Sequence, residues 1–154
     1  MTIHPGNVPP LQQDNIISNV FLGNGVELIN SEFFGNERAM GMFDNAQSVI
    51  GLESGIVLST GEVEFVKEPN SGTATISGNT SASTVVDEAL ETLAGVKVVD
   101  IAKFELEFVP SADLLSFRYV FASEEYPNFV CGNRNDVFGF FISGPKPGGG
   151  FYDG

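Results

Sequence analysis

The chain has 154 residues, enough for one domain with its own core, and its 20 acidic and 7 basic residues give a net charge of -13. This charge repels phosphate backbones, which excludes nucleic acid as an expected partner, and no stretch approaches the ~18 apolar residues of a membrane span. The single cysteine excludes an internal disulfide and a cysteine-based zinc site, and the single histidine argues against a histidine-dependent catalytic triad or metal site.

The N-terminal segment, residues 1–10, predicts an extended arm, because its three prolines oppose helix. It lacks the basic and apolar regions of a secretory signal peptide. Residues 11–154 follow as a single expected domain without an internal repeat. Its first element is a short predicted helix over residues 11–22, ended by Gly23.

The composition, with 18 Gly and 14 Phe, predicts many short strands joined by turns. The first strands are expected at residues 26–34, 39–43 and 55–61. The polar stretch 67–82 is interpreted as an exposed loop. A second short helix is expected after Thr84, which can cap it, and Gly95 ends it. Its apolar positions are Val86, Leu90 and Leu93.

The clearest strand pattern covers residues 102–108, where apolar and charged side chains alternate as in an antiparallel sheet with one wet face. Residues 115–121 predict the next strand, whose apolar face carries Phe117 and Tyr119. Residues 137–142 are apolar on both faces, which indicates a central strand. The expected fold is all-β, a mainly antiparallel β-sandwich or jelly roll with two short helices.

The loop between these last two strands concentrates oxygen-bearing side chains. Its candidate Ca²⁺ ligands are Glu124, Glu125, Asn133, Asn135 and Asp136. Without a soft ligand set, Ca²⁺ is the expected metal, although the spacing is not that of an EF-hand. In the alternative interpretation, Glu124 or Asp136 pairs with Arg118 or Arg134, or caps backbone N–H groups.

The same loop carries Tyr126 and Phe129, which could stack on sugar rings or anchor a partner protein, or could instead plug the end of the core. Acid–base catalysis is the weaker hypothesis. Adjacent residues on a strand point to opposite faces, so Glu124 and Glu125 make a poor pair, whereas Glu124 with Asp136 stays geometrically open. No nucleophile motif accompanies them, and an enzyme is not expected.

Four blocks of the sequence resemble the choice-of-anchor L domain family in order and approximate spacing. They cover residues 55–61, 104–110, 116–127 and 135–145. The resemblance extends over residues 11–154. It implies a domain of large bacterial cell-surface or exported proteins, located outside the cell and linked with adhesion, without firmly assigned chemistry.

The sequence is expected to depart from the family pattern in lacking an export signal and an anchor. It also stops before the family's last part, where further strands and a second cysteine are expected. The domain is therefore expected to be C-terminally incomplete, with Cys131 lacking its usual partner. Missing strands would leave an open sheet edge that invites pairing with another chain.

These observations predict a non-enzymatic extracellular adhesion or interaction domain of a bacterial surface or secreted protein, stabilised by Ca²⁺. Its expected partner is a glycan, a surface protein or a second copy of itself. The alternative is a subunit of a surface assembly or filament, completed by strand exchange and reached by the N-terminal arm. A carboxylate-dependent glycan hydrolase is the third hypothesis.

Overall fold

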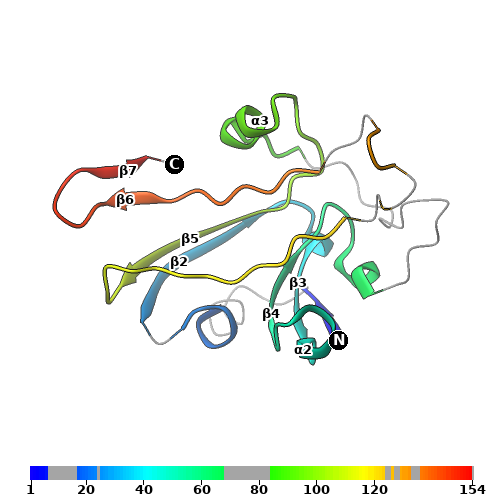
Figure 1. The fold of residues 1–154 in the computed structure, drawn as a ribbon, viewed down its shortest axis with the longest axis horizontal. Helices are drawn as coiled ribbons and strands as arrows, with labels where there is room; N and C mark the ends of the chain where they lie inside the picture. Colours follow the sequence, from blue (N-terminus) through cyan, green and yellow to red (C-terminus); the bar gives the residue numbers. More distant parts are fainter. Residues whose placement is uncertain are drawn as a thin grey trace.

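The structure is a computed structural model that describes residues 1–6, 17–23, 25–67, 84–123, 126, 129–132 and 136–153. The strands of these residues form three small antiparallel sheets, which Figure 1 shows with short helices around them. The first sheet has the order β1-β3-β4. Its strands are β1 (Thr2–Pro5), β3 (Met40–Asp44) and β4 (Gly55–Leu58).

The buried core lies against this first sheet. Ile3 of β1 is opposite Phe43 of β3, which in turn is opposite Gly55 of β4. A Cβ atom on Gly55 would lie 2.9 Å from the Phe43 ring, so this glycine leaves room for the ring. Ala46 and Val63 complete the buried cluster. Residues 2–5 are thus extended, as predicted for the N-terminal segment, and they pair with β3 of their own chain.

The second sheet pairs β2 (Val26–Phe34) with β5 (Lys103–Pro110) in antiparallel register, with a bulge after Leu28. Along β5, exposed glutamates alternate with half-buried apolar side chains, which confirms the strand predicted from the alternating pattern. Phe104 also packs edge-on against Phe21, with ring centroids 6.4 Å apart.

Helical segments are short in the described part of the chain. They are η1 (Ile17–Phe21), η2 (Glu37–Ala39), α2 (Gln47–Ile50), η3 (Val63–Lys67) and α3 (Glu88–Ala94). The first predicted helix corresponds to the π-helical turn η1, while residues 11–16 lie outside the described residues. The loop expected at 67–82 lies almost entirely outside them too.

The second predicted helix is confirmed as α3, but its predicted cap is wrong. Asp87, not Thr84, precedes the first helical residue, and its carboxylate accepts a hydrogen bond of 2.9 Å from the Leu90 N–H. Gly95 ends α3 in the left-handed conformation, as expected. The apolar positions of this helix are less covered than expected, because Leu93 is exposed.

The predicted antiparallel, strand-rich class is confirmed, whereas the closed sandwich or jelly roll is not seen among the described residues. The physical reason is that residues 114–122 and 137–142, despite strand-like sequences, join no sheet and run as plain traces in Figure 1. The prediction of a buried central strand at 137–142 is therefore wrong. The chain adds instead a terminal hairpin of β6 (Ser143–Pro145) and β7 (Phe151–Asp153).

Candidate functional site

The structure describes both ends of the predicted calcium loop, Ser123 and Asp136. Of its candidate ligands, Asp136 is described, and the other four lie outside the described residues. Ser123 Oγ donates a hydrogen bond of 2.8 Å to Asp136 Oδ2, which ties together positions 13 residues apart. No cluster of three or more His, Cys, Asp or Glu side chains that could hold a metal occurs among the described residues. Ca²⁺ binding stays a prediction.

The predicted aromatic contacts of this loop differ in exposure. Tyr126 is exposed and Phe129 is half-buried. Nearby, Cys131 is an exposed free thiol with a positive φ of 63°. The exposure of Tyr126 is compatible with a ligand contact, and the partial burial of Phe129 is compatible with a structural role.

An aromatic cluster that the sequence placed in the core lies on the surface. We call it the aromatic ladder, and it consists of Phe117, Tyr119, Phe121, Phe138 and Phe140. Its side chains are 41–60% exposed, so the prediction that residues 115–121 present a buried face is wrong. The reason is that no described strand covers them.

The rings of the ladder form stacked pairs between two segments of the chain. The Phe117 ring lies 4.1 Å from that of Phe140 at an interplanar angle of 23°, and Tyr119 lies 5.1 Å from Phe138 at the same angle. The partner of Tyr119 therefore precedes the partner of Phe117 in the sequence by two residues. This order shows that the segments 117–121 and 138–140 run antiparallel. The ring faces of these pairs are turned toward one another.

Both segments of the ladder are anchored to the rest of the structure. Arg118 Nη2 donates a hydrogen bond of 2.7 Å to the carbonyl oxygen of Gly51, which follows α2. A Cβ atom on Gly139 would lie 2.5 Å from the Phe141 ring and 3.2 Å from Leu90 of α3, so residues 137–142 pack closely there. Arg118 therefore donates to a backbone carbonyl, whereas Asp136 accepts from Ser123.

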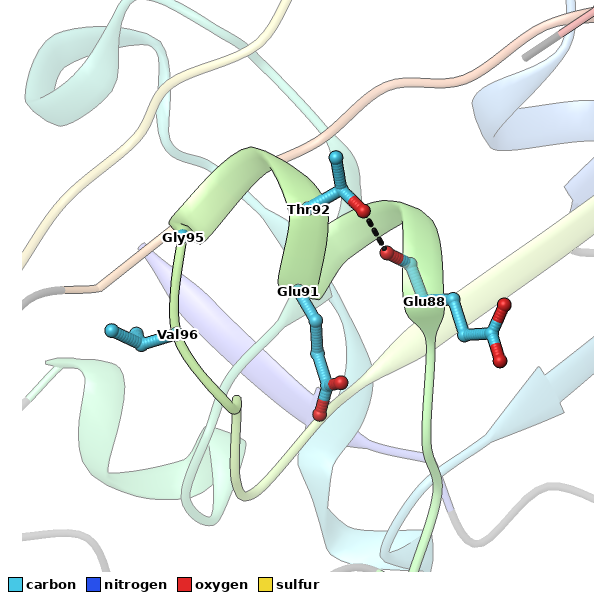
Figure 2. A pocket seen from close by; sticks show the side chains of 5 residues that line it. All are labelled: Glu88, Glu91, Thr92, Gly95 and Val96. Atoms are coloured by element: carbon cyan, nitrogen blue, oxygen red, sulfur yellow. Dashed lines mark hydrogen bonds between the residues drawn. The ribbon is translucent and has the colours of Figure 1, made fainter.

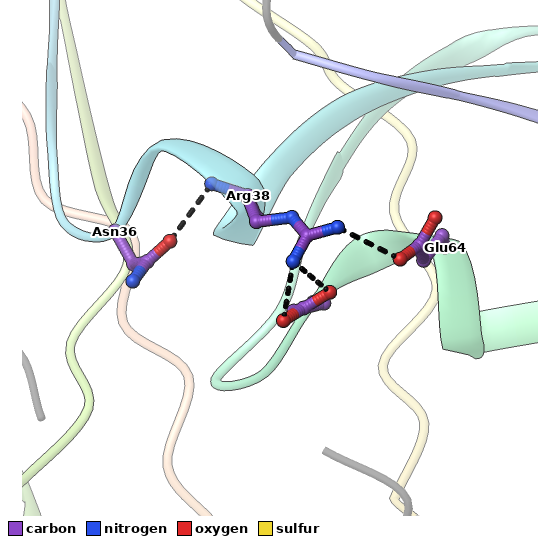
Figure 3. Close-up of polar contacts among 4 residues, drawn as sticks. Asn36, Arg38 and Glu64 are labelled. Atoms are coloured by element: carbon purple, nitrogen blue, oxygen red, sulfur yellow. Dashed lines mark hydrogen bonds and ion pairs between the residues drawn. The ribbon is translucent and has the colours of Figure 1, made fainter. Parts of the chain in front are cut away.

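A second polar cluster, which the sequence did not indicate, centres on Arg38. Figure 3 shows Asn36 accepting the Arg38 N–H and the guanidinium reaching Glu64, at 2.9 and 3.1 Å. The same guanidinium pairs with Glu62, whose side chain is only 4% exposed. The partners are separated by 24 residues or more, so no local pattern reveals them. A fully paired cluster of this kind stabilises the fold.

Helix α3 is linked to β5 by a third charged group. The Leu90 N–H and then the Lys103 ammonium hold the pKa of Asp87 below its usual value. Hydrogen bonds to Glu105 first and to Asp87 next raise the pKa of Lys103. Lys103 Nζ lies 2.7 Å from Glu105 and 2.9 Å from Asp87. The arrangement ties the start of α3 to β5.

An open depression lies on the surface of α3. It is lined by Glu88, Glu91, Thr92, Gly95 and Val96, as Figure 2 shows. The Thr92 hydroxyl donates a hydrogen bond of 2.8 Å to the Glu88 carbonyl oxygen. These residues supply two carboxylates and one hydroxyl that already donates to a backbone carbonyl oxygen.

Together, the small antiparallel sheets and the exposed aromatic ladder define a β-rich domain with aromatic side chains on its surface. The choice-of-anchor L domain family matches residues 7–150, and the chain belongs to this family, which is typical of exported bacterial proteins. Comparison with curated proteins and with solved structures gave no match. No helix in the described part of the chain has the length and apolarity needed to cross a membrane.

Proposed function

We propose that the chain is a non-enzymatic interaction domain of an exported bacterial surface protein. The observation that carries this proposal is the aromatic ladder, whose five rings are 41–60% exposed on a chain with a net charge of -13. Contiguous exposed aromatic side chains are typical of interaction surfaces, whereas an acidic protein keeps most of its surface charged. Family membership supplies the expected place outside the cell.

The ring geometry favours a protein over a glycan as the partner. A sugar stacks on an open ring face, but Phe117 and Phe140 turn their faces toward each other at 4.1 Å, as do Tyr119 and Phe138 at 5.1 Å. The ladder therefore offers mainly ring edges to a partner. Apolar side chains of another protein can pack against such edges, which are common at protein interfaces.

Ca²⁺ binding by the loop between Ser123 and Asp136 is the second part of the proposal. The oxygen-bearing side chains of this loop support it, and the hydrogen bond between Ser123 and Asp136 brings the loop ends together. Ca²⁺ at 100 times its dissociation constant would stabilise the domain by about 2.7 kcal/mol. A rise in melting temperature with millimolar Ca²⁺, reversed by EDTA, tests this part.

The matched variants for the calcium test are Asp136→Asn and Asp113→Asn. Each removes one carboxylate charge, and both residues are exposed. We expect the Ca²⁺ shift to disappear in the first variant and to persist in the second. No shift in the unmodified protein, or an equal loss in both variants, contradicts a site at Asp136.

The interaction proposal is tested with immobilised domain against a panel of purified bacterial and host surface proteins and glycans. We expect saturable binding to protein members, weakened by Tyr119→Ala with Phe138→Ala and kept by the control Val99→Ala, an exposed valine outside the ladder. Binding that the ladder substitutions leave intact, or release of sugar from any glycan, would overturn the proposal.

A further inference from the structure

We propose that the aromatic ladder binds its partner by strand addition, in which an extended segment of another protein, apolar in its middle and basic at both ends, pairs with the backbone of residues 114–122. The inference rests on the proposed function and names the partner class of the same surface. It is carried by the conformation of the segment, by its unpaired backbone and by the charges at its two ends.

Residues 114–122 run as an extended segment that is open to solvent. The Phe117 and Tyr119 rings, two positions apart, lie on the same side with their centroids 5.6 Å apart, which is the side-chain period of a strand. Arg118, between them, donates instead to the carbonyl oxygen of Gly51. Every residue from 114 to 122 is exposed. The segment therefore already has the shape of a strand, and no strand of the described residues covers it.

The backbone of this segment is available for pairing. Among the described residues, the hydrogen bonds of strands, helices and turns include no N–H or carbonyl group of residues 114–122. The segment contains neither glycine nor proline, and its aromatic residues favour a strand. Unpaired backbone groups on an exposed segment of this kind are a template for strand addition.

The strands β2 and β5 also have one free edge each, but charged side chains protect them. Glu27 of β2 and both Glu105 and Glu107 of β5 are exposed. Charged residues on an edge strand oppose the addition of a further strand. Residues 114–122 contain a single charged residue, Arg118, so they are less protected than either strand.

The charges at the two ends of the segment indicate what kind of strand it accepts. Asp113 directly precedes the segment, and Asp136 lies at its far end, where it accepts a hydrogen bond from Ser123. Both aspartates are exposed, and neither forms an ion pair with another described residue. At about 3.3 Å per residue, a strand with basic residues about ten positions apart reaches both carboxylates.

The middle of the matching strand is apolar. Its side chains on one face would lie beside Phe117, Tyr119 and Phe121, and β-branched residues pair favourably with aromatic residues across neighbouring strands. A second copy of the chain is a poor occupant, because antiparallel pairing of the segment with itself sets Arg118 opposite Arg118 on two chains of charge -13. The net charge favours a basic partner instead.

Synthetic peptides test the pairing with the unmodified protein. The first peptide alternates valine and threonine between two lysines about ten positions apart, and its matched control has glutamate at both ends. Fluorescence anisotropy is measured in EDTA, which keeps Asp136 free of metal. We expect saturable binding of the lysine peptide and a dissociation constant at least about tenfold higher for the glutamate peptide. Equal affinities, or no binding of the lysine peptide, would overturn the inference.

Methylation of the peptide backbone separates strand pairing from charge attraction alone. Successive N–H groups of a strand point to opposite edges, so methylating every second nitrogen blocks one edge and leaves the other intact. Of the two alternately methylated lysine peptides, we expect one to lose about tenfold or more in affinity and the other to bind like the parent peptide. Equal affinities of the two methylated peptides would contradict strand addition.

A photoreactive group in the middle of the lysine peptide locates the contact. We expect cross-links to residues 114–122, whereas cross-links to the acidic face of β2 and β5 would refute the inference. A dimer of the chain that the peptide does not dissociate would refute it too, because a second copy then occupies the segment. If no peptide binds while panel proteins still bind through Tyr119 and Phe138, strand addition is wrong and the proposed function stands.

Discussion

The Nη1 atom of Arg38 lies 2.9 Å from each carboxylate oxygen of Glu62, a side chain that is 4% exposed. The Arg38 side chain itself stays in contact with solvent and also reaches Glu64. Glu62 directly precedes η3, and Arg38 lies in η2, so the pair fixes two helical turns beside the core residue Val63. A buried carboxylate is tolerated when it is paired in this way.

Arg38→Met should destabilise the domain more than removal of its exposed partner. The substitution leaves the Glu62 carboxylate buried and without its cation, at an expected cost of about 2–4 kcal/mol, slightly discounted because Arg38 is exposed. Glu64→Gln removes only a solvent-exposed pair, worth under about 1 kcal/mol. Urea unfolding of both variants measures the difference, and equal losses would show that Glu62 does not depend on Arg38.

Asp87→Ala should destabilise α3 by about 1 kcal/mol, because the Leu90 N–H loses its acceptor and Lys103 loses one carboxylate. Asp87→Asn keeps an amide oxygen for the cap and removes only the charge. We expect it to retain most of the stability in chemical denaturation. If both variants lose the same free energy, the Lys103 pair and not the cap holds the helix.

Local sequence patterns predicted the strands and helix ends that are specified by neighbouring residues. Alternation along residues 103–110 predicted β5, and Gly95 predicted the end of α3. Asp87 was missed as the cap because Thr84 is equally suitable by type, and only the chain path decides between them. The helix α2 covers four residues, too few for a helical period.

The tertiary arrangement depended on partners far along the chain. Residues 114–122 and 137–142 have strand-like sequences, but a strand also requires a neighbouring backbone, which no local pattern specifies. The stack of Phe117 on Phe140 joins positions 23 residues apart, so the exposed ladder was interpreted as core. For the candidate calcium site, the sequence indicated oxygen-bearing side chains of the type that Ca²⁺ prefers. It did not indicate the hydrogen bond between Ser123 and Asp136, which joins positions 13 residues apart.

Acidification should weaken the attachment of β1. His4 Nε2 lies 2.9 Å from Asp44 Oδ2, and this hydrogen bond is the main cause that lowers the pKa of Asp44. A carboxyl with a lowered folded pKa contributes stability above its unfolded pKa of about 4, and that contribution is lost as the pH falls through the folded pKa.

Melting curves from pH 6 to pH 2.5 test this linkage, because the contribution of Asp44 is lost as the pH falls below the unfolded pKa. Asp44→Asn should flatten the acid side of the profile, whereas Asp113→Asn, an exposed aspartate in the turn after β5, should leave it unchanged. An identical acid limb in both variants would show that other carboxyls dominate.

Gly41→Ala should separate β1 from β3. A Cβ atom at this position would lie 2.6 Å from the His4 carbonyl oxygen and 2.9 Å from Val63 Cγ2, and the backbone atom cannot rotate away. We expect a loss of about 1–3 kcal/mol, as in other overpacked sites. Gly23→Ala is the control, because a Cβ atom there meets no atom within 4 Å. Urea unfolding measures both, and a Gly41→Ala variant as stable as the control would contradict the close β1–β3 pairing.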